Sequence, residues 1–170
     1  DHYISHPDLF RDYLNQAQSY LDTHQNGIVT LGIKPSYPET GYGYIQYQFH
    51  DTDGVYPVQA FVEKPDYETA CEYVQSGEYL WNAGMFIVKR GYLQDQFQSF
   101  LPDIYMHMKR IEEAKGSDRL SHVIAQEYPQ CQALSIDYGI LEKSNQVQVI
   151  PVDMGWRDIG NWKAISEVCD

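Results

Sequence analysis

The feature that most constrains the fold is a nearly continuous apolar run at Ile28–Ile33, which Lys34 and Pro35 close. A short run of this kind is typical of a strand that is buried on both faces of a sheet. Strands of this type belong mainly to parallel or mixed sheets that helices cover. The run therefore predicts a parallel or mixed sheet.

Helical and strand patterns alternate along the rest of the chain. Apolar residues recur at helical spacing over residues 8–24, between Pro7 and the stop signal Asn26-Gly27. Further strands are expected at residues 44–50, 58–63, 85–89 and 147–152, with a turn at Asp51-Thr52-Asp53-Gly54. Further helices are expected at residues 68–75, 91–100, 103–115, 119–125 and 161–168. This order predicts an α/β fold with a mixed, mainly parallel sheet flanked by helices.

Composition narrows the class of protein. A length of 170 residues suits one domain, and 12 Lys+Arg against 24 Asp+Glu give a formal net charge of -12. A chain with this net negative charge lacks the basic surface with which proteins bind nucleic acids or anionic lipids. No apolar run approaches the roughly 20 residues of a membrane span, and the first residues do not form a signal peptide. Three widely spaced cysteines fit reduced thiols, so we expect a soluble cytoplasmic protein without a nucleic-acid or membrane partner.

One carboxylate near the C-terminus is framed by glycines and tryptophans. Asp158 lies in the segment Gly155-Trp156-Arg157-Asp158-Ile159-Gly160-Asn161-Trp162, just before a helical pattern. Glycine permits strained or closely approached backbone, and indoles exclude water while keeping one polar atom. The segment predicts that Asp158 is displayed at a tight turn as a hard oxygen ligand suited to Mg²⁺.

Two further segments place glycines or charges at the ends of predicted strands. Gly41 and Gly43 surround Tyr42 before a strand, which would let the main chain approach a ligand, although an ordinary turn explains them equally. Glu63 and Lys64 end an apolar strand. Alternation sends these two side chains to opposite sides unless the strand end twists them toward one cleft, and a surface ion pair is the competing explanation.

Asn82 and Asp137 are the remaining candidates. Asn82 is a donor and an acceptor among apolar and small neighbours, so it could read a sugar hydroxyl, or it could satisfy local backbone in a turn. Asp137, like Ser135, could bind a ligand or cap a short helix. The six histidines are scattered and suggest no nucleophilic triad.

Five segments carry a family resemblance when they are taken together. They are ETGYGYI at residues 39–45, FVEKPD at 61–66, WNAGMF at 81–86, SIDYGILEK at 135–143 and GWRDIGNW at 155–162. This combination resembles the mannose-1-phosphate guanylyltransferase (GDP-mannose pyrophosphorylase) family, whose members make GDP-mannose from GTP and mannose 1-phosphate. The resemblance spans nearly the whole chain and implies a Rossmann-like nucleotidyltransferase fold.

The resemblance implies a role for each matching residue. Asp1 and Asp158 would ligate Mg²⁺, and Lys64 would meet the sugar phosphate, which makes these three the predicted catalytic residues. The chemistry implied is in-line attack of a mannose 1-phosphate oxygen on the α-phosphorus of GTP. The predicted substrate-binding residues, which would contact the sugar or its phosphate, are Tyr42, Gly43, Glu63, Lys64, Asn82 and Asp137.

Family members begin with a strand and a glycine-rich loop that grip the triphosphate, and nothing in this sequence matches them. Asp1 and His2 instead resemble the end of the family's Ala-Asp-His strand. The resemblance therefore implies that residues 1–170 are the sugar-phosphate- and metal-binding portion of one nucleotidyltransferase domain, truncated at its N-terminus. We expect this chain to be inactive alone, and Asp1 to fray at the chain end.

Two other functions stay open at this stage. One is a nucleotidyltransferase of different sugar or nucleotide specificity, and the other is a non-catalytic sugar-phosphate-binding module. The sequence leaves open whether an isomerase-type domain follows Asp170. An unpaired sheet edge on the nucleotide side would favour assembly into a homo-oligomer.

Overall fold

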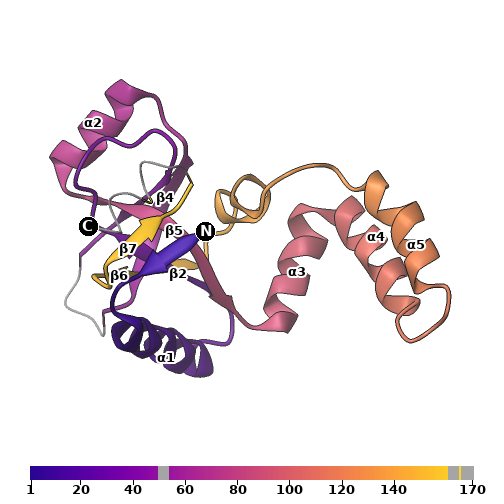
Figure 1. Cartoon of the computed structure of the whole chain (residues 1–170). Helices are drawn as coiled ribbons and strands as arrows, with labels where there is room; N and C mark the ends of the chain where they lie inside the picture. Colours follow the sequence, from indigo (N-terminus) through magenta and orange to yellow (C-terminus); the bar gives the residue numbers. More distant parts are fainter. Residues whose placement is uncertain (50–53, 161–164, 166–170) are drawn as a thin grey trace. The chain divides into compact units, whose positions relative to one another are not determined.

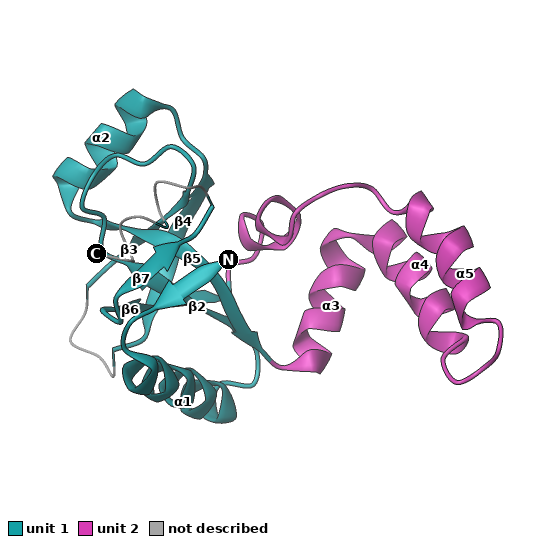
Figure 2. Ribbon diagram, viewed as in Figure 1, with its two compact units in different colours: residues 1–88, 146–170 teal, residues 89–145 magenta. Residues whose placement is uncertain are grey.

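The computed structural model describes residues 1–49, 54–160 and 165 (Figure 1). They fall into two compact units, coloured separately in Figure 2. Unit 1 takes in Asp1–Val88 and Gln146–Asp170, as far as these are described, and unit 2 is Lys89–Asn145. The helix predicted at residues 161–168 and the turn predicted at 51–54 lie outside the described residues, except for Ile165 and Gly54.

The described part of unit 1 contains the strands together with helices α1 and α2. In chain order its elements are β1 (His2–Ile4), α1 (Pro7–Thr23), β2 (Ile28–Ile33), β3 (Gly43–Tyr47), β4 (Tyr56–Glu63), α2 (Tyr67–Ser76), β5 (Tyr79–Val88), β6 (Val147–Val152) and β7 (Trp156–Asp158). β2 and β6 have the bounds that their apolar runs predict. β5 begins six residues before its predicted start at residue 85, so the WNAGMF segment lies inside a strand and not ahead of one.

Strand pairing corrects the predicted sheet. β2 is parallel to β6, but β2–β5, β3–β4, β3–β5 and β4–β6 are antiparallel pairs. These pairings close into the order β2-β5-β3-β4-β6, and β1 pairs antiparallel with β7 as a separate ribbon. The α/β character and the mixed pairing are confirmed, whereas the mainly parallel, Rossmann-like sheet is not. The error has a physical cause: an apolar run reports burial on both faces, and a closed set of strands provides that burial whatever their direction.

Two helices cover the strands of unit 1. Ala17 and Leu21 of α1 pack into the main core with Val29, Ile150 and residues around them. On α2, Ala70 is buried against Tyr44 and Trp81 in a second cluster. Asp66 caps α2 by accepting the Thr69 N–H at 2.8 Å, and left-handed Gly77 ends that helix. The two helices lie at opposite sides of the strands in the view of Figure 1.

Unit 2 is helical. It comprises α3 (Arg90–Phe100), α4 (Pro102–Glu113), α5 (Leu120–Glu127), a 3₁₀ turn at Tyr128–Gln130 and a π-helical turn at Asp137–Leu141. One oxygen of Glu127 on α5 receives His107 Nδ1 at 2.8 Å and Arg110 Nη1 at 3.0 Å, both from α4. None of the helices within the described ranges combines the length and the apolar character that crossing a bilayer requires.

We predict that the α4–α5 contact weakens in acid through Glu127. Hydrogen bonds from His107 and then Arg110 hold the pKa of Glu127 below its usual value. A carboxyl whose pKa is lower in the folded state stabilises the fold above its unfolded pKa, near 4.3, and loses that effect as pH falls through the folded pKa. We therefore expect the free energy of unfolding, measured with urea at pH 7 and below pH 4, to fall less on acidification in Glu127→Gln than in the unchanged chain.

The matched control is Glu113→Gln, because Glu113 is an exposed glutamate at the end of α4. Its acid dependence should equal that of the unchanged chain. An acid-induced loss in Glu127→Gln as large as in the unchanged chain would show that this ion pair does not sense pH.

Candidate functional site

The predicted metal ligand Asp158 ends the β1–β7 ribbon. Trp156 pairs with Ile4 and Asp158 with His2, and one step further Ile159 N donates to Asp1 O at 2.6 Å. The backbone of Asp1 is thus paired in the structure, which differs from the expected fraying. The Asp158 side chain is 36% exposed, so its carboxylate is accessible at the end of a short paired segment.

Gly155 makes the turn that leads into this ribbon. Its φ is +65°, a conformation that favours glycine, and a Cβ at this position would overlap Ser5 Oγ and lie 2.9 Å from Ser5 Cβ. Ser5 N in turn donates to Gly155 O at 3.3 Å. The glycine predicted to allow a tight turn therefore also allows close contact between the strand ends of β1 and β7.

Glu63 and Lys64 lie together at the end of β4. Lys64 has a φ of +50°, which is strained for a residue with a side chain, and its Nζ forms an ion pair with Glu63 Oε1. The left-handed backbone overrides the alternation that would have separated the two charges. The Glu63 side chain is only 8% exposed, whereas that of Lys64 is 58% exposed. A buried carboxylate thus lies beside a lysine whose side chain can reach solvent.

Gly43 leaves room for that carboxylate. It pairs with Glu63 across β3 and β4, and a Cβ on Gly43 would lie 2.5 Å from Glu63 Oε2 and 3.4 Å from Asn82 Cβ. Tyr42 O accepts the Lys64 N–H at 3.3 Å. The glycine segment and the EKP segment are therefore adjacent, with Glu63 and Asn82 meeting over the bare backbone of Gly43.

Asn82 is held at an irregularity of the β2–β5 ladder, whose register shifts between Thr30 and Gly32. Asn82 Oδ1 accepts the Gly84 N–H at 3.1 Å and lies 3.3 Å from the Thr30 hydroxyl, which is also 3.2 Å from Met85 O. Asn82 Oδ1 therefore does make the local contacts that were the alternative to ligand binding. These contacts also fix the orientation of the amide, which is what a binding role requires.

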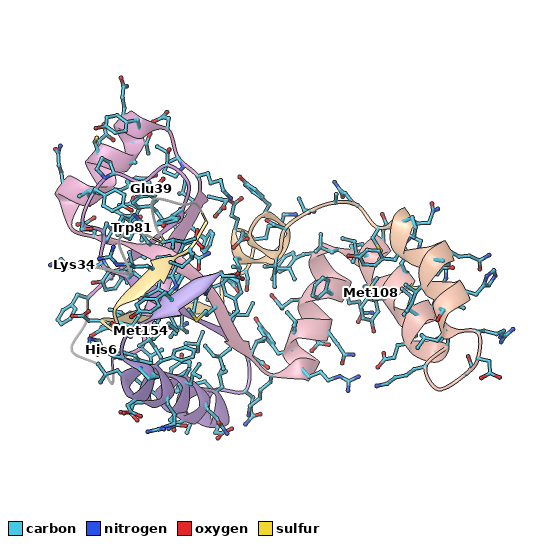
Figure 3. The ribbon with its side chains drawn as sticks, in the orientation of Figure 1. His6, Lys34, Glu39, Trp81, Met108 and Met154 are labelled. Carbon is cyan, nitrogen blue, oxygen red and sulfur yellow. The ribbon has the colours of Figure 1, made fainter. Side chains whose placement is uncertain are left out.

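Tyr42 joins the two halves of the site through its ring. It makes edge contacts with Trp81 of β5 at 5.4 Å and with Trp156 of β7 at 5.6 Å between ring centroids. Tyr37 lies edge-on to Trp81 at 4.9 Å. Figure 3 labels Trp81 and Glu39, which belong to this region of unit 1. The ring of Tyr42 therefore links the strand that carries Asn82 to the strand that carries Asp158.

The hydroxyl of Tyr42 is in an acidic surrounding. Burial raises the pKa of Tyr42 well above its usual value, and Tyr37, Asp158 and Glu39 raise it further. The raised pKa means that the phenol stays protonated to a higher pH than usual. The indole Nε1 of Trp156 is buried with no acceptor among the described residues.

The site lies beyond the carboxyl ends of the parallel strands β2 and β6. Ile33 pairs with Val152 at that end, and the chain continues from β2 to Tyr42 and from β6 to Trp156. Ligands of α/β proteins commonly bind outside the carboxyl ends of parallel strands. Unit 1 thus gathers Tyr42, Gly43, Glu63, Lys64, Asn82, Asp158 and the backbone of Asp1.

Asp137 is the exception among the predicted site residues. It begins the π-helical turn of unit 2, where its backbone oxygen accepts the Glu142 N–H at 3.0 Å. The Tyr138 N–H lies 3.5 Å from Ser135 Oγ, so Ser135 is closer than Asp137 to the capping role weighed for both. A ligand-binding role for Asp137 stays a prediction.

The carboxylates of unit 1 suit a metal that keeps water and substrate ligands. Within the described ranges no three His, Cys, Asp or Glu side chains gather as a metal site. Mg²⁺ is commonly bound by one or two carboxylates and completes its shell with phosphate oxygens and water. Accessible Asp158 fits that pattern and not an all-protein cage. Asp1 lies near it through its α-ammonium, 3.8 Å from Asp158 Oδ1, so a ligand role for the Asp1 carboxylate stays a prediction.

Comparison with known proteins identifies the family. The model of the nucleotidyl transferase family matches residues 1–170. The chain belongs to this family. Two relatives, the mannose-1-phosphate guanylyltransferases of Escherichia coli and Klebsiella pneumoniae, are each 40% identical over 99% of this chain. The chain spans about a third of their length, 36% in both cases.

A solved structure of a relative has a fold similar to that of this chain. The crystal structure of a mannose-1-phosphate geranyltransferase from Thermus thermophilus aligns with a TM-score of 0.82 and 33% identity, covering 100% of this chain and 48% of that one. The α/β fold of this chain is therefore similar to that of a known relative.

Three contributors to the site were not predicted from the sequence. His2 pairs with Asp158 and contacts Trp156, the ring of Trp81 contacts Tyr42, and Tyr37 lies beside Tyr42. β1 and β7 are three residues each, which is too short for an alternating pattern to predict a strand. The sequence therefore could not show that β1 pairs with the segment of Trp156. A signal did exist for Thr30, a hydroxyl in the middle of an apolar run that has to find a buried partner.

We predict that Gly155→Ala destabilises the chain more than Gly77→Ala. Both glycines have a positive φ, +65° and +70°, so both variants should lose about 1 kcal/mol from backbone strain. Nothing lies within 4 Å of a Cβ at Gly77, whereas a Cβ at Gly155 meets Ser5. The steric overlap should add about 2 kcal/mol in urea unfolding. Equal losses would mean that the β1–β7 turn tolerates a side chain.

We also predict that the ring of Tyr42, more than its hydroxyl, stabilises unit 1. Tyr42→Phe keeps both tryptophan contacts and should change the free energy of unfolding by about 1 kcal/mol or less. Tyr42→Ala removes them and should cost about 2–3 kcal/mol, below the range for a fully buried ring. The control is Tyr128→Ala, at a side chain that is 64% exposed, with an effect of about 0.5 kcal/mol or less. A loss in Tyr42→Phe equal to that in Tyr42→Ala would contradict the bridging role.

Proposed function

We propose that this chain supplies the sugar-phosphate- and metal-binding portion of a nucleotidyltransferase domain that makes GDP-mannose and pyrophosphate from GTP and mannose 1-phosphate. The observation that carries the proposal is the meeting of Glu63, Asn82 and Asp158 around Tyr42 in unit 1. The similarity to mannose-1-phosphate guanylyltransferases supports the choice of sugar and nucleotide.

Glu63 and Asn82 read the mannose ring in this proposal. Glu63 is nearly buried, and its Oε2 packs against the bare backbone of Gly43, which holds the carboxylate in place as an acceptor for a sugar hydroxyl. The Asn82 amide is fixed through its oxygen by Gly84 and Thr30. A carboxylate and an oriented amide above a glycine form a small polar set of the kind that recognises sugars.

Lys64 supplies the positive charge that a phosphate ligand needs. The chain has a formal net charge of -12, and Glu39, Glu63 and Asp158 are all acidic groups of this region, so an anion requires local compensation. Lys64 is paired with Glu63, yet its side chain is 58% exposed. It can therefore turn toward a sugar phosphate as a mobile point charge while Glu63 engages the sugar.

Asp158 and Asp1 would hold Mg²⁺ through their carboxylates. When bound, the ion neutralises phosphate charge and orients phosphate oxygens for displacement. In the reaction an oxygen of mannose 1-phosphate forms a bond to the α-phosphorus of GTP, and the bond from that phosphorus to the bridging oxygen of pyrophosphate breaks. The role of the side chains is to position and neutralise the reactants, and no protein nucleophile takes part.

The remaining parts of the proposal concern the surroundings of the site. Asp137 of unit 2 is a further candidate sugar contact, supported by the SIDYG match alone. Reduced cysteines and a nucleotide substrate favour a cytoplasmic reaction. Association into a homo-oligomer remains a proposal, but the closed order β2-β5-β3-β4-β6 does not offer it the unpaired sheet edge that we expected from the sequence.

The direct test is GDP-mannose synthesis by the full-length protein with GTP, mannose 1-phosphate and Mg²⁺. Asp158→Asn should lower the turnover number about 100-fold or more, because a metal ligand supports several kcal/mol of transition-state stabilisation. Lys64→Gln should raise the KM for mannose 1-phosphate about tenfold, as loss of a charge-assisted contact implies.

Asp153→Asn is the matched control, because Asp153 follows β6 and is exposed. It loses the same charge near the same ribbon and should keep full activity. Preference for glucose 1-phosphate with UTP or dTTP would overturn the assignment of sugar and nucleotide. Binding of mannose 1-phosphate without any nucleotidyl transfer would support a non-catalytic module instead.

A further inference from the structure

His2 lies directly opposite Asp158 in the β1–β7 ribbon. The hydrogen bonds of Ile159 N to Asp1 O and of Ser5 N to Gly155 O mark the hydrogen-bonded pairs of this ladder. By alternation the His2–Asp158 pair is a non-hydrogen-bonded one, where facing side chains come closest. Both side chains therefore leave the ribbon on the same face, which is also the face of Trp156.

Two further contacts place the imidazole. Its ring meets Trp156 edge to face, with 5.7 Å between centroids and an angle of 72°. Its Cε1 lies 3.9 Å from the position that a Cβ would take at Gly84. The imidazole is thus adjacent to Gly84, whose backbone N–H donates to Asn82 Oδ1, while His2 as a whole remains exposed.

These contacts put His2 between the residue that reads the sugar and the residue that holds the metal. In a sugar 1-phosphate the phosphate is joined directly to the ring, so a ligand with its sugar at Asn82 and a metal at Asp158 has its phosphate between them. The indole that His2 contacts also has a buried Nε1–H without an acceptor among the described residues. His2 and Trp156 thus bring N–H groups to the end of the site where the Asp158 carboxylate also lies.

We propose that His2 binds the phosphate of the sugar 1-phosphate by donating a ring N–H to one of its oxygens. The inference rests on the proposed function, because it takes the sugar to lie at Glu63 and Asn82. A neutral imidazole carries one N–H donor, so the contact does not depend on protonation of the ring. Packing on Trp156 fixes the direction of the ring, which lets a single hydrogen bond discriminate in favour of phosphorylated sugar.

The test compares two ligands, mannose 1-phosphate and methyl α-mannoside, by NMR titration of the full-length protein with Mg²⁺. His2→Phe keeps a ring against Trp156 but removes the donor. It should weaken mannose 1-phosphate binding about tenfold, the effect of one hydrogen bond to a charged acceptor, and leave methyl α-mannoside unchanged. His2→Asn restores a donor and should recover part of the loss. His122→Phe, at an exposed histidine of α5, is the control and should match the unchanged protein.

Each other outcome has a defined meaning. Unchanged mannose 1-phosphate binding in His2→Phe would overturn the inference, and equal weakening of both ligands would assign His2 a packing role only. If the unchanged protein prefers glucose 1-phosphate, the proposed sugar is wrong, and the same loss in His2→Phe with that ligand would still support the phosphate contact. If no sugar 1-phosphate binds, both the proposed function and this inference fail.

Discussion

The site depends on the parallel pairing of β2 with β6. Six residue pairs, from Ile28–Val147 to Ile33–Val152, fix the register between two strands that are far apart in the sequence. Because the strands run in the same direction, the chain leaves both at one end. The loop that carries Tyr42 and the ribbon that carries Asp158 therefore meet at this end, and the side chains of Tyr42 and Trp156 complete the contact.

Glycines and one left-handed residue let polar groups come together at this end of β2 and β6. Gly43 makes room for the carboxylate of Glu63, and Gly155 lets β1 approach β7 through Ser5. Lys64 accepts a left-handed backbone, which brings its charge back to Glu63. The shape of the site is thus set where side chains are missing or backbone is strained, as is common where ligands bind.

The acidic character of the chain shapes the chemistry that the site can perform. Asp158 and Glu39 both raise the pKa of Tyr42, and Glu63 is compensated by an exposed lysine. An anionic substrate entering such a region needs cations and hydrogen-bond donors in defined places. A metal at Asp158, the ammonium of Lys64 and hydrogen-bond donors such as His2 would together meet that need.

Burial was predictable from the sequence, but strand direction was not. The apolar runs of β2 and β6 gave the correct strand bounds, and periodicity located α1 and the helices of unit 2. The same runs suggested a mainly parallel sheet, because burial on both faces does not report which neighbour a strand has. Asn82 was placed ahead of β5 and lies within it, since Asn, Ala and Gly have low strand propensity that tertiary packing overrides.

The sequence motifs correctly pointed to several residues that lie together in unit 1, such as Glu63, Asn82 and Asp158. They could not show that Asp137 belongs to unit 2, because the division follows from contacts and not from composition. They did include His2 in the match to the Ala-Asp-His strand, but not its register opposite Asp158, on which the proposed phosphate contact rests. Cross-strand neighbours of this kind depend on pairing between the two ends of the chain, which no local pattern contains.

One sugar 1-phosphate is proposed to span unit 1 from Glu63 and Asn82 to Asp158. The most direct measurement is a crystal structure of the full-length protein with mannose 1-phosphate and Mn²⁺, in which anomalous scattering locates the metal. We expect sugar hydroxyls at Glu63 and Asn82, the metal at Asp158, and the phosphate between them. A sugar bound elsewhere, or a metal away from Asp158, would contradict this arrangement.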